Sequence, residues 1–441
     1  MIAIGGAIGT GLFLGSGTAI GFAGPAVVLS YAIGGVIAFL LMGAMAEMTV
    51  AHPASGSFGA WAEIYIGPLA GYLVRYAYWS SLVFAVGTEV AAIAVYMRYW
   101  FPQSPGWPWV LALSGALIAV NATHVKLFGS IEYFFSVLKV AAILAFIVLG
   151  ARLVFTQIGF GNYTAHGGFL PHGVPGMWVG VLVAIFSYFG IEMVAVASGE
   201  ARDPHRAITR AFRATMFRLA VFYLLSLALI VAIMPWTAAN TAQSPFVVVV
   251  ARTHIPGAAG VVNFMVLVAA LSAMNGQLYI TTRMMFSLAR AGYAPRRWGE
   301  LNARGIPLGA LLASTIGIAV AAVLNAVSPG TAFTLMMSVS MFGAIFAWLM
   351  IFITHFFFRR HHARDAHYDH APLAFRMWGY PWSTAAGVVL MVAILVTTAF
   401  TREFRMTLVC GVPFLLLLTV IFQVRRRKAP IARRAAAGVS R

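Results

Sequence analysis

Apolar stretches about twenty residues long, separated by short polar breaks, dominate this sequence. A transmembrane helix needs roughly 20 consecutive, mostly apolar residues to cross the hydrocarbon core of a bilayer. The stretches are too long and too continuous for the strands of a membrane β-barrel, so they predict helices. Twelve spans are predicted, at about 1–22, 26–50, 68–98, 108–122, 130–155, 176–199, 213–236, 258–290, 307–326, 330–358, 382–400 and 405–424.

Composition agrees with this interpretation. Hydrophobic residues make up 61% of the chain and charged residues only 9%, whereas soluble domains contain about 25% charged residues. A soluble globular protein and a disordered chain are therefore excluded. The single cysteine, Cys410, allows no internal disulfide, which excludes a disulfide scaffold. The fold class that remains is an all-α membrane protein.

The charge balance predicts the topology. The 29 Lys and Arg residues outnumber the 11 Asp and Glu residues. They lie in the breaks between spans, where lipid headgroups and topology account for them, so no nucleic-acid partner is expected. Most fall on one predicted face, which predicts a protein of the cytoplasmic membrane with both termini in the cytoplasm. The opposite face carries Arg98, Arg152, Arg252, Arg402 and Arg405.

The chain opens on an apolar segment with neither the charged first region nor the cleavage site of a signal peptide. The first span looks short before its glycine run, which predicts a truncated N-terminus. The longest polar insert, about 359–381, could bind a metal but is more often a solvated loop, and no metal or other cofactor is expected. Its histidines are His361, His362, His367 and His370.

Two spans carry helix-breaking signals near their middles. Four glycines fall within residues 5–11, and each costs about 1 kcal/mol in a helix interior, so an unwound segment is predicted there. The sixth span reads FSYFGIE at 186–192, with Gly190 and Glu192 inside the membrane. Broken helices at matching positions in two halves of a chain indicate a transporter binding site. The alternative for the first break is G-x-x-x-G helix packing.

Five of the charged residues within predicted spans are singled out, because ionisable groups inside the membrane are functional candidates by default. Lys139 can take the place of a bound sodium ion, or it can snorkel to the surface. Glu192 can relay protons, or it can accept the N–H groups freed by the break. Glu89 can line the cavity or pair with a distant polar group. Glu47 and Arg283, near the ends of their spans, are interpreted as gate or packing partners.

The eighth span carries a polar stripe. Ser272, Asn275, Tyr279 and Thr282 recur at helical spacing and share one face. Such a stripe predicts either a water-accessible cavity or interhelical hydrogen bonds.

Four segments together carry a family resemblance. They are GGAIGTGLFLGSG at 5–17, FSYFGIEMVAVASGEARDP at 186–204, SPFVVVVARTHIPG at 244–257 and LSAMNGQLYITTRMMFSLARAGYAP at 271–295. With these the chain resembles the amino acid–polyamine–organocation (APC) superfamily and, within it, the bacterial amino acid permeases, over nearly its whole length. The resemblance implies a leucine-transporter-type 5+5 inverted repeat with discontinuous helices 1 and 6. The implied units are residues 1–155 and 176–358 as the two repeats, 382–424 as two further spans and 425–441 as a basic cytoplasmic tail.

The resemblance also implies a binding site. The backbone N–H groups of Thr10 and Gly11 would hold an amino acid's carboxylate, and carbonyls of the two breaks would hold its ammonium. Phe186 would close over the substrate. Lys139 matches a lysine that replaces sodium in proton-coupled relatives, and Glu192 matches a glutamate linked to gating or proton coupling; Glu89 completes the predicted coupling set. The predicted substrate-binding residues are Ala7, Ile8, Gly9, Thr10, Gly11, Phe186, Ser187, Phe189, Gly190 and Asn275.

These features predict a proton symporter that imports amino acids by alternating access. The breaks carry Phe, Tyr, Ser and Gly with one charged side chain, Glu192, which favours neutral or aromatic substrates. An exchanger or a sodium-coupled symporter on the same fold is the nearest alternative, and a non-transporting amino acid sensor or a channel is further away. An enzyme is not expected, because no metal-ligand spacing, nucleophile elbow or phosphate loop is present. The expected partners are an amino acid, protons and membrane lipid; the oligomeric state stays open.

Overall fold

The computed structural model describes residues 8–52, 57–123, 125–193, 204–240, 242–362, 373 and 375–428. These residues form helices and connecting segments, without a β-strand among them. Eight of the helical segments are long and apolar enough to cross a membrane. Three shorter apolar helices accompany them: Gly106–Ala122, Gly173–Tyr188 and Val221–Ile233. The prediction of an all-helical, multi-span architecture is therefore confirmed.

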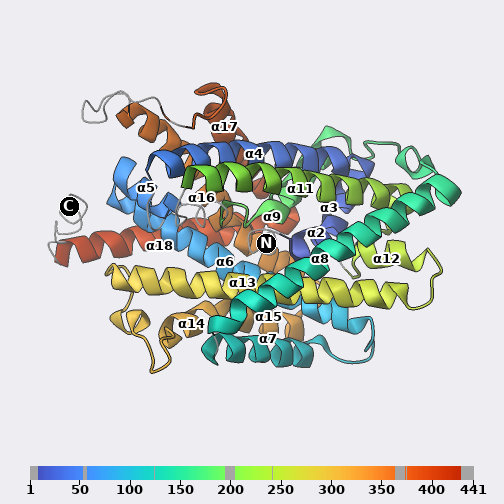
Figure 1. Cartoon of the computed structure of the whole chain (residues 1–441), viewed down its shortest axis with the longest axis horizontal. Coiled ribbons are helices and arrows are strands. Elements are labelled where there is room, and N and C mark those ends of the chain that lie inside the picture. The colour runs from blue at the N-terminus through green and yellow to red at the C-terminus, as the bar shows by residue number, and fades with distance from the viewer. Residues whose placement is uncertain are drawn as a thin grey trace.

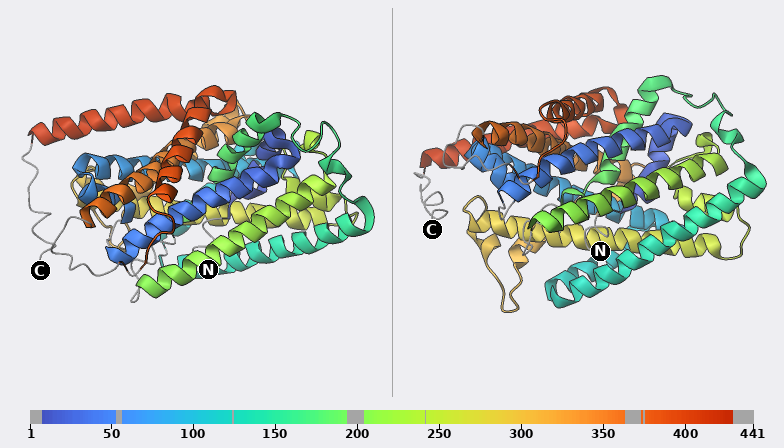
Figure 2. Two further views of the ribbon diagram at one scale, coloured as in Figure 1. Left: turned by 90° about the horizontal axis from the view of Figure 1, so that it is seen from above. Right: turned by 45° about the horizontal axis from the view of Figure 1, so that its top comes forward.

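The helices form one elongated bundle, with most of them running along its length (Figure 1). α18 follows one edge and extends past the other helices (Figure 2). The first group of helices is α2 (Thr10–Phe13), α3 (Gly15–Ala23), α4 (Val27–Ala51), α5 (Ser57–Tyr65), α6 (Pro68–Arg98), α7 (Gly106–Thr123) and α8 (Val125–Leu153). The second group is α9 (Gly173–Tyr188), α11 (Pro204–Ile233), α12 (Pro245–Ala251), α13 (Ala258–Arg290), α14 (Leu308–Ser314), α15 (Ile316–Val327), α16 (Ala332–His362), α17 (Trp382–Phe400) and α18 (Arg405–Lys428).

The central helix is α6, which packs most extensively against α16 and α13. Small residues allow its backbone to approach its neighbours closely. A Cβ added at Gly343 would overlap the carbonyl of Ala77, and one added at Gly317 would overlap the carbonyl of Val83. Ser81 and Ser340 each donate a hydroxyl to the other's backbone carbonyl, at 2.7 and 2.8 Å. These contacts join α6 and α16 into one scaffold.

Several predicted spans differ from the observed helices. The first described helical segment begins at Thr10, and α9 ends at Tyr188, inside the predicted span 176–199. Helix α11 begins at Pro204, ahead of the predicted start at 213, and the ninth span is divided at Thr315 into α14 and α15. The short helices α5 and α12 were not predicted, because neither is long enough to cross a bilayer.

We call the end of the bundle where α4, α13, α16 and α18 terminate the basic end (left in Figure 1). Glu47 of α4 is fully buried there and forms an ion pair with Arg359 of α16. Its carboxylate also accepts the Met377 N–H at 2.6 Å and lies 3.3 Å from His355 Nε2. Glu47 thus holds α4, α16 and the segment before α17 together, and its role here is packing.

The histidine-rich insert gives no metal centre within the described ranges, where no group of three His, Cys, Asp or Glu side chains could hold an ion. His361 and His362 lie at the end of α16. His367 and His370 lie outside the described residues.

Candidate functional site

The first break lies immediately before α2. Gly9 is extended, with φ −131° and ψ −156°, and the helix starts at Thr10. The Thr10 N–H donates to both carboxylate oxygens of Glu89, at 3.3 and 3.2 Å. Glu89 projects from α6 and is 3% exposed. A buried carboxylate therefore occupies the start of this helix, where unpaired N–H groups and the helix dipole favour an anion.

Glycine is required on both sides of this contact because three other helices approach it. A Cβ at Gly9 would lie 2.5 Å from Glu89 Oε1 and 3.1 Å from Ala273 Cβ of α13. A Cβ at Gly11 would lie 2.9 Å from the Cα of Ser187 in α9. The glycines predicted to unwind the first span thus also serve close packing, so the two interpretations of this motif are compatible.

The second break follows α9. Phe189 leaves the helix with ψ 143°, and Gly190 adopts φ +98°, a conformation that favours glycine. The Gly190 N–H donates to both oxygens of Glu192, at 3.2 and 3.1 Å. The hydroxyl of Tyr78, from α6, donates to Glu192 Oε1 at 2.6 Å. Glu192 is fully buried, and its carboxylate compensates the N–H group freed by the break.

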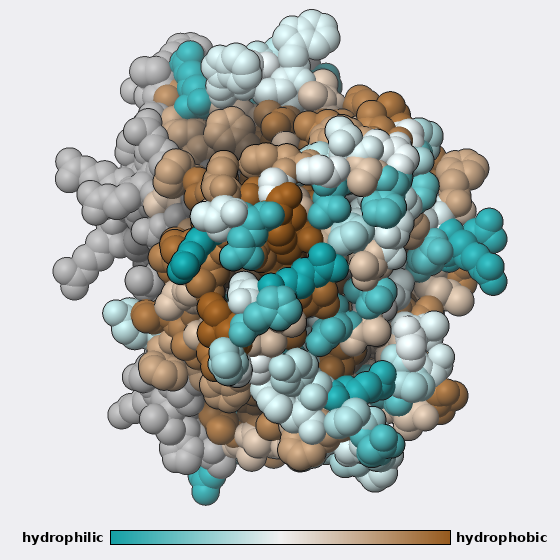
Figure 3. Space-filling model, turned by 90° about the vertical axis from the view of Figure 1, so that its right-hand side faces the viewer, coloured by the Kyte–Doolittle hydropathy of each residue, from teal (hydrophilic) through white to brown (hydrophobic). Residues whose placement is uncertain are grey.

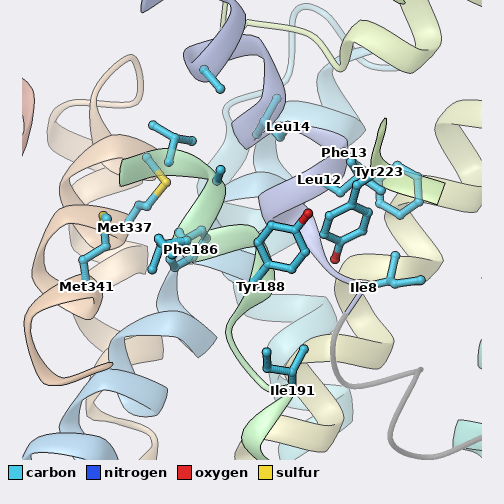
Figure 4. Close-up of a cluster of buried hydrophobic side chains, with 14 of the residues drawn as sticks. Ile8, Leu12, Phe13, Leu14, Phe186, Tyr188, Ile191, Tyr223, Met337 and Met341 are labelled. Carbon is cyan, nitrogen blue, oxygen red and sulfur yellow. The ribbon is translucent and has the colours of Figure 1, made fainter. Parts of the chain in front are cut away.

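The two breaks lie against each other, since α2 contacts α9 directly. Figure 4 shows Tyr188 between Phe186 on one side and Ile8, before α2, and Leu12, within α2, on the other. Ile8 is fully buried.

Side chains from neighbouring helices hold α9 at this point. Ser187 Oγ is 2.9 Å from the hydroxyl of Tyr31, and the Ser187 carbonyl accepts the Tyr223 hydroxyl at 2.8 Å. Phe186 and Phe189 contact edge to face, with ring centroids 5.7 Å apart. The Phe189 ring in turn packs edge to face on Trp348 of α16, at 5.3 Å. The second break is therefore surrounded by aromatic rings and hydroxyl groups.

Lys139, predicted as a coupling residue, is a buried cation. It belongs to α8 and is 1% exposed, so its side chain does not snorkel to the protein surface. Its charge acts on the buried carboxylate of Glu89.

One of the residues predicted for the site is not part of this group. Asn275 lies two residues after Ala273, about 200° around α13, and its Oδ1 accepts the Asn121 amide of α7 at 2.8 Å. The Asn275 side chain therefore faces α7, whereas Ala273, two residues earlier, faces Gly9. Ala7 lies outside the described residues.

The sequence interpretation missed three tyrosines: Tyr31, Tyr78 and Tyr223. Each is at most 1% exposed, and each hydroxyl contacts either Ser187 in the last turn of α9 or Glu192 after the second break. A buried tyrosine normally needs a hydrogen-bond partner. Tyrosines within apolar spans were therefore a usable signal for a polar centre inside the bundle.

A cavity of about 340 Å³ opens at the end opposite the basic end, lined by Arg98, Asn240 and Gln243 among others. Figure 3 views this end, where a depression with a hydrophobic floor is partly covered by hydrophilic side chains. Helix α12 contributes to the cavity wall and also covers α2. Ser244 Oγ donates to the Phe13 carbonyl at 2.6 Å, and the Phe13 and Phe246 rings are 5.0 Å apart.

Comparison with known proteins identifies the family. The model of the family described as amino acid permease matches residues 1–431. The chain belongs to the amino acid permease family. This permease is therefore a multi-pass membrane protein and a transporter rather than an enzyme.

Bacterial relatives match the permease almost end to end. It is 38% identical to the gamma-aminobutyric acid permease of Bacillus subtilis (strain 168), over 97% of this chain and 92% of that protein. It is 36% identical to the uncharacterized amino acid permease YtnA of the same strain, over 96% of this chain and 92% of the relative. It is 35% identical to the aromatic amino acid transport protein AroP of Salmonella typhimurium (strain SL1344), over 97% and 94%.

Proposed function

We propose that this permease imports neutral or aromatic amino acids across the cytoplasmic membrane by proton symport with alternating access. Relatives named for gamma-aminobutyric acid and for aromatic amino acids support the general substrate class. Both kinds of molecule carry one ammonium and one carboxylate, whereas their remaining parts differ. The shared requirement is therefore one subsite that binds a carboxylate and another that binds an ammonium group.

The proposed architecture is twelve spans with two inverted repeats, residues 1–155 and 176–358, followed by 382–424. Its support is the position of the two breaks, before Thr10 and at Gly190, each near the start of one repeat. The concentration of arginines at the basic end supports cytoplasmic termini. We assign the tail from residue 425 onward to the cytoplasm on the same ground.

The observation that carries the proposal is the hydrogen bond from the Thr10 N–H to Glu89. This contact supports a carboxylate subsite at the start of α2. In the proposed cycle the substrate carboxylate binds in this carboxylate subsite, on the N–H groups of Thr10 and Gly11. Its ammonium meets the carbonyl groups of Phe186 and Phe189, and the Phe186 ring closes over it.

Competition between the Glu89 carboxylate and the substrate carboxylate for this subsite couples proton binding to substrate binding. While Glu89 is ionised, its carboxylate holds the Thr10 N–H and repels a second carboxylate. Protonation removes that charge and weakens the contact, because hydrogen bonds to charged groups are roughly twice as strong as neutral ones. Proton and amino acid therefore bind together. Lys139 balances the negative charge near the carboxylate subsite. Glu192 and Tyr78 form the second proton-sensitive contact.

The cavity lined by Arg98 is the proposed outer vestibule. The contact of Ser244 and Phe246 with Phe13 separates it from α2. Opening of this contact would admit substrate from outside. Closure here and opening toward the basic end would complete alternating access.

The first experiment measures uptake of pooled labelled amino acids into proteoliposomes with an alkaline lumen and no sodium. Glu89→Gln, which imitates the protonated side chain, should retain exchange of labelled substrate but lose accumulation driven by the pH gradient. Glu300→Gln, an exposed loop substitution, is the matched control and should accumulate substrate normally.

The remaining outcomes separate the alternatives. Accumulation that requires sodium would contradict proton symport. Exchange without net accumulation in the unchanged protein would indicate an antiporter, and binding without any flux would indicate a sensor. If accumulation driven by the pH gradient persists in Glu89→Gln, Glu89 is removed from the coupling mechanism.

A further inference from the structure

A second cavity lies on the opposite side of α13 from the Gly9 contact, toward the basic end. It has a volume of about 200 Å³ and is bounded by α7, α13, α14 and the 301–307 segment. Its polar lining includes Arg283, Thr282 and Asn121, and its apolar lining includes Phe286 and Leu311. Figure 1 shows these elements along one side of the bundle. The cavity therefore belongs to the outer wall of the protein.

Arg283 supplies the cationic group of this cavity. Its guanidinium donates to the Tyr279 hydroxyl at 2.9 Å and lies 5.3 Å from the centre of the Tyr279 ring. The side chain is exposed, and none of the carboxylates in the described ranges pairs with it. A guanidinium has five N–H donors in a planar arrangement suited to phosphate. Most of these donors remain available to a ligand.

The position of Arg283 along α13 corresponds to the lipid headgroup boundary. The helix runs from Ala258 to Arg290, and its middle residue is Met274. Arg283 is about 14 Å from that midpoint, at a rise of 1.5 Å per residue. Half of the hydrocarbon thickness is about 15 Å. A guanidinium at this depth lies just beneath the phosphate layer.

The charge around the cavity favours an anion. Between residues 283 and 308 the chain carries five arginines and one carboxylate, Glu300. Arg290 lies next to the cavity, because its guanidinium is 5.9 Å from the Phe286 ring centre. Arg304 lies in the segment that bounds it. An anionic headgroup therefore meets a positive field from several directions.

The surroundings of the cavity also suit acyl chains. Leu301, which lines it, is 54% exposed, and Leu308 and Leu312 of α14 are 40% and 57% exposed. Ile316, at the start of α15, is 50% exposed. In a membrane protein this continuous apolar surface faces hydrocarbon. A free anion would leave these side chains unused, whereas a phospholipid covers them.

We propose that this cavity binds one anionic phospholipid from the leaflet at the basic end. Its phosphate lies on Arg283, and its acyl chains cover Leu301 and α14. Basic pockets between membrane helices bind such headgroups in general. The inference requires only that the protein spans a membrane, so it does not rest on the proposed substrate or coupling ion.

The test titrates the purified full chain in neutral detergent with phosphatidylglycerol and, separately, with phosphatidylcholine, counting bound lipid by native mass spectrometry. We expect one phosphatidylglycerol to bind at least about tenfold more tightly than phosphatidylcholine, the range of a charge-assisted contact. Arg283→Gln should lose this preference. Arg405→Gln, an exposed arginine at the other end, should keep it.

A second variant separates loss of the lipid site from misfolding of Arg283→Gln. Leu301→Trp keeps every charge but fills the cavity from an exposed position, and it should also lose the preference. Equal binding of both lipids to the unchanged protein would overturn the proposal, as would a preference retained in both variants. Displacement of the lipid by millimolar inorganic phosphate alone would assign the site to a free anion. Displacement by labelled amino acids would assign it to the transport pathway.

Discussion

The carboxylate of Glu89 accepts the backbone N–H of Thr10 from a position 79 residues away in the chain. This contact joins the central helix α6 to the first turn of α2. The same face of α6 reaches the second break through Tyr78 and Glu192. Both breaks are thus closed by a carboxylate, and one helix participates in both closures.

Gly11→Ala should weaken substrate binding. The new Cβ would lie 2.9 Å from the Cα of Ser187, and neither backbone can move freely. Overpacking of this kind costs about 1–3 kcal/mol, which corresponds to roughly fivefold to hundredfold in affinity. Isothermal titration with the identified substrate measures the change. Gly115→Ala on α7, which meets nothing within 4 Å, is the control, and equal affinities would refute the close contact.

Lys139→Met should abolish uptake driven by a pH gradient, because the cation that balances Glu89 is removed from a buried position. Initial rates in proteoliposomes check this expectation. Lys428→Met, at the last residue of α18, removes the same type of charge and is the control. Normal uptake in Lys139→Met would exclude this lysine from the mechanism.

Tyr78→Phe removes the 2.6 Å hydrogen bond to Glu192 and little else. Hydrogen bonds to charged groups contribute about 1.5–3 kcal/mol, so proton-driven accumulation should fall by at least about tenfold. The complete pH profile of uptake should be compared with that of Tyr133→Phe, an exposed tyrosine. If the two profiles coincide, the contact is structural only.

Ser244→Ala should favour opening toward the vestibule, since it removes the hydrogen bond from α12 to the Phe13 carbonyl. A net contribution of about 0.5–1.5 kcal/mol shifts the open population roughly twofold to tenfold. In a Cys410→Ser background, a cysteine introduced at buried Ser16 should react faster with an impermeant thiol reagent. Ser328→Ala, in the segment between α15 and α16, should leave that rate unchanged.

His52, at the end of α4, should make the fold sensitive to acid. Burial lowers the pKa of His52 below 6.5, so the unfolded chain binds the proton more readily than the folded chain. Its stabilising effect is therefore present above about pH 6.5 and is lost as the pH falls. The melting temperature in detergent should drop less between pH 7.5 and 5.5 in His52→Asn than in the unchanged protein. His254→Asn, which alters an exposed histidine, should show the full drop.

Hydropathy predicted the helical class, and glycine content indicated the extended backbone at Gly9 before α2 and the irregular backbone at Gly190 after α9. Length alone could not reveal α5 and α12, which are too short to resemble spans. The partners of the breaks were also out of reach, because periodicity assigns a residue to a helix face but does not say which helix that face meets. Asn275 illustrates this: its stripe is real, yet it faces Asn121 rather than Gly9. Tyr78 was missed for the same reason.

In the proposed proton symport, the placement of Tyr78 and Glu89 on α6 bears on how tightly proton movement is coupled to substrate movement. They are about three helical turns apart, roughly 16 Å along one face, and α6 is joined to α16 by the paired serines Ser81 and Ser340. Moving both contacts together would require α6 to shift against α16. In the proposed proton symport, the rigidity of this helix pair therefore opposes uncoupled proton leak, and Ser340→Ala should increase proton leak before it alters substrate affinity.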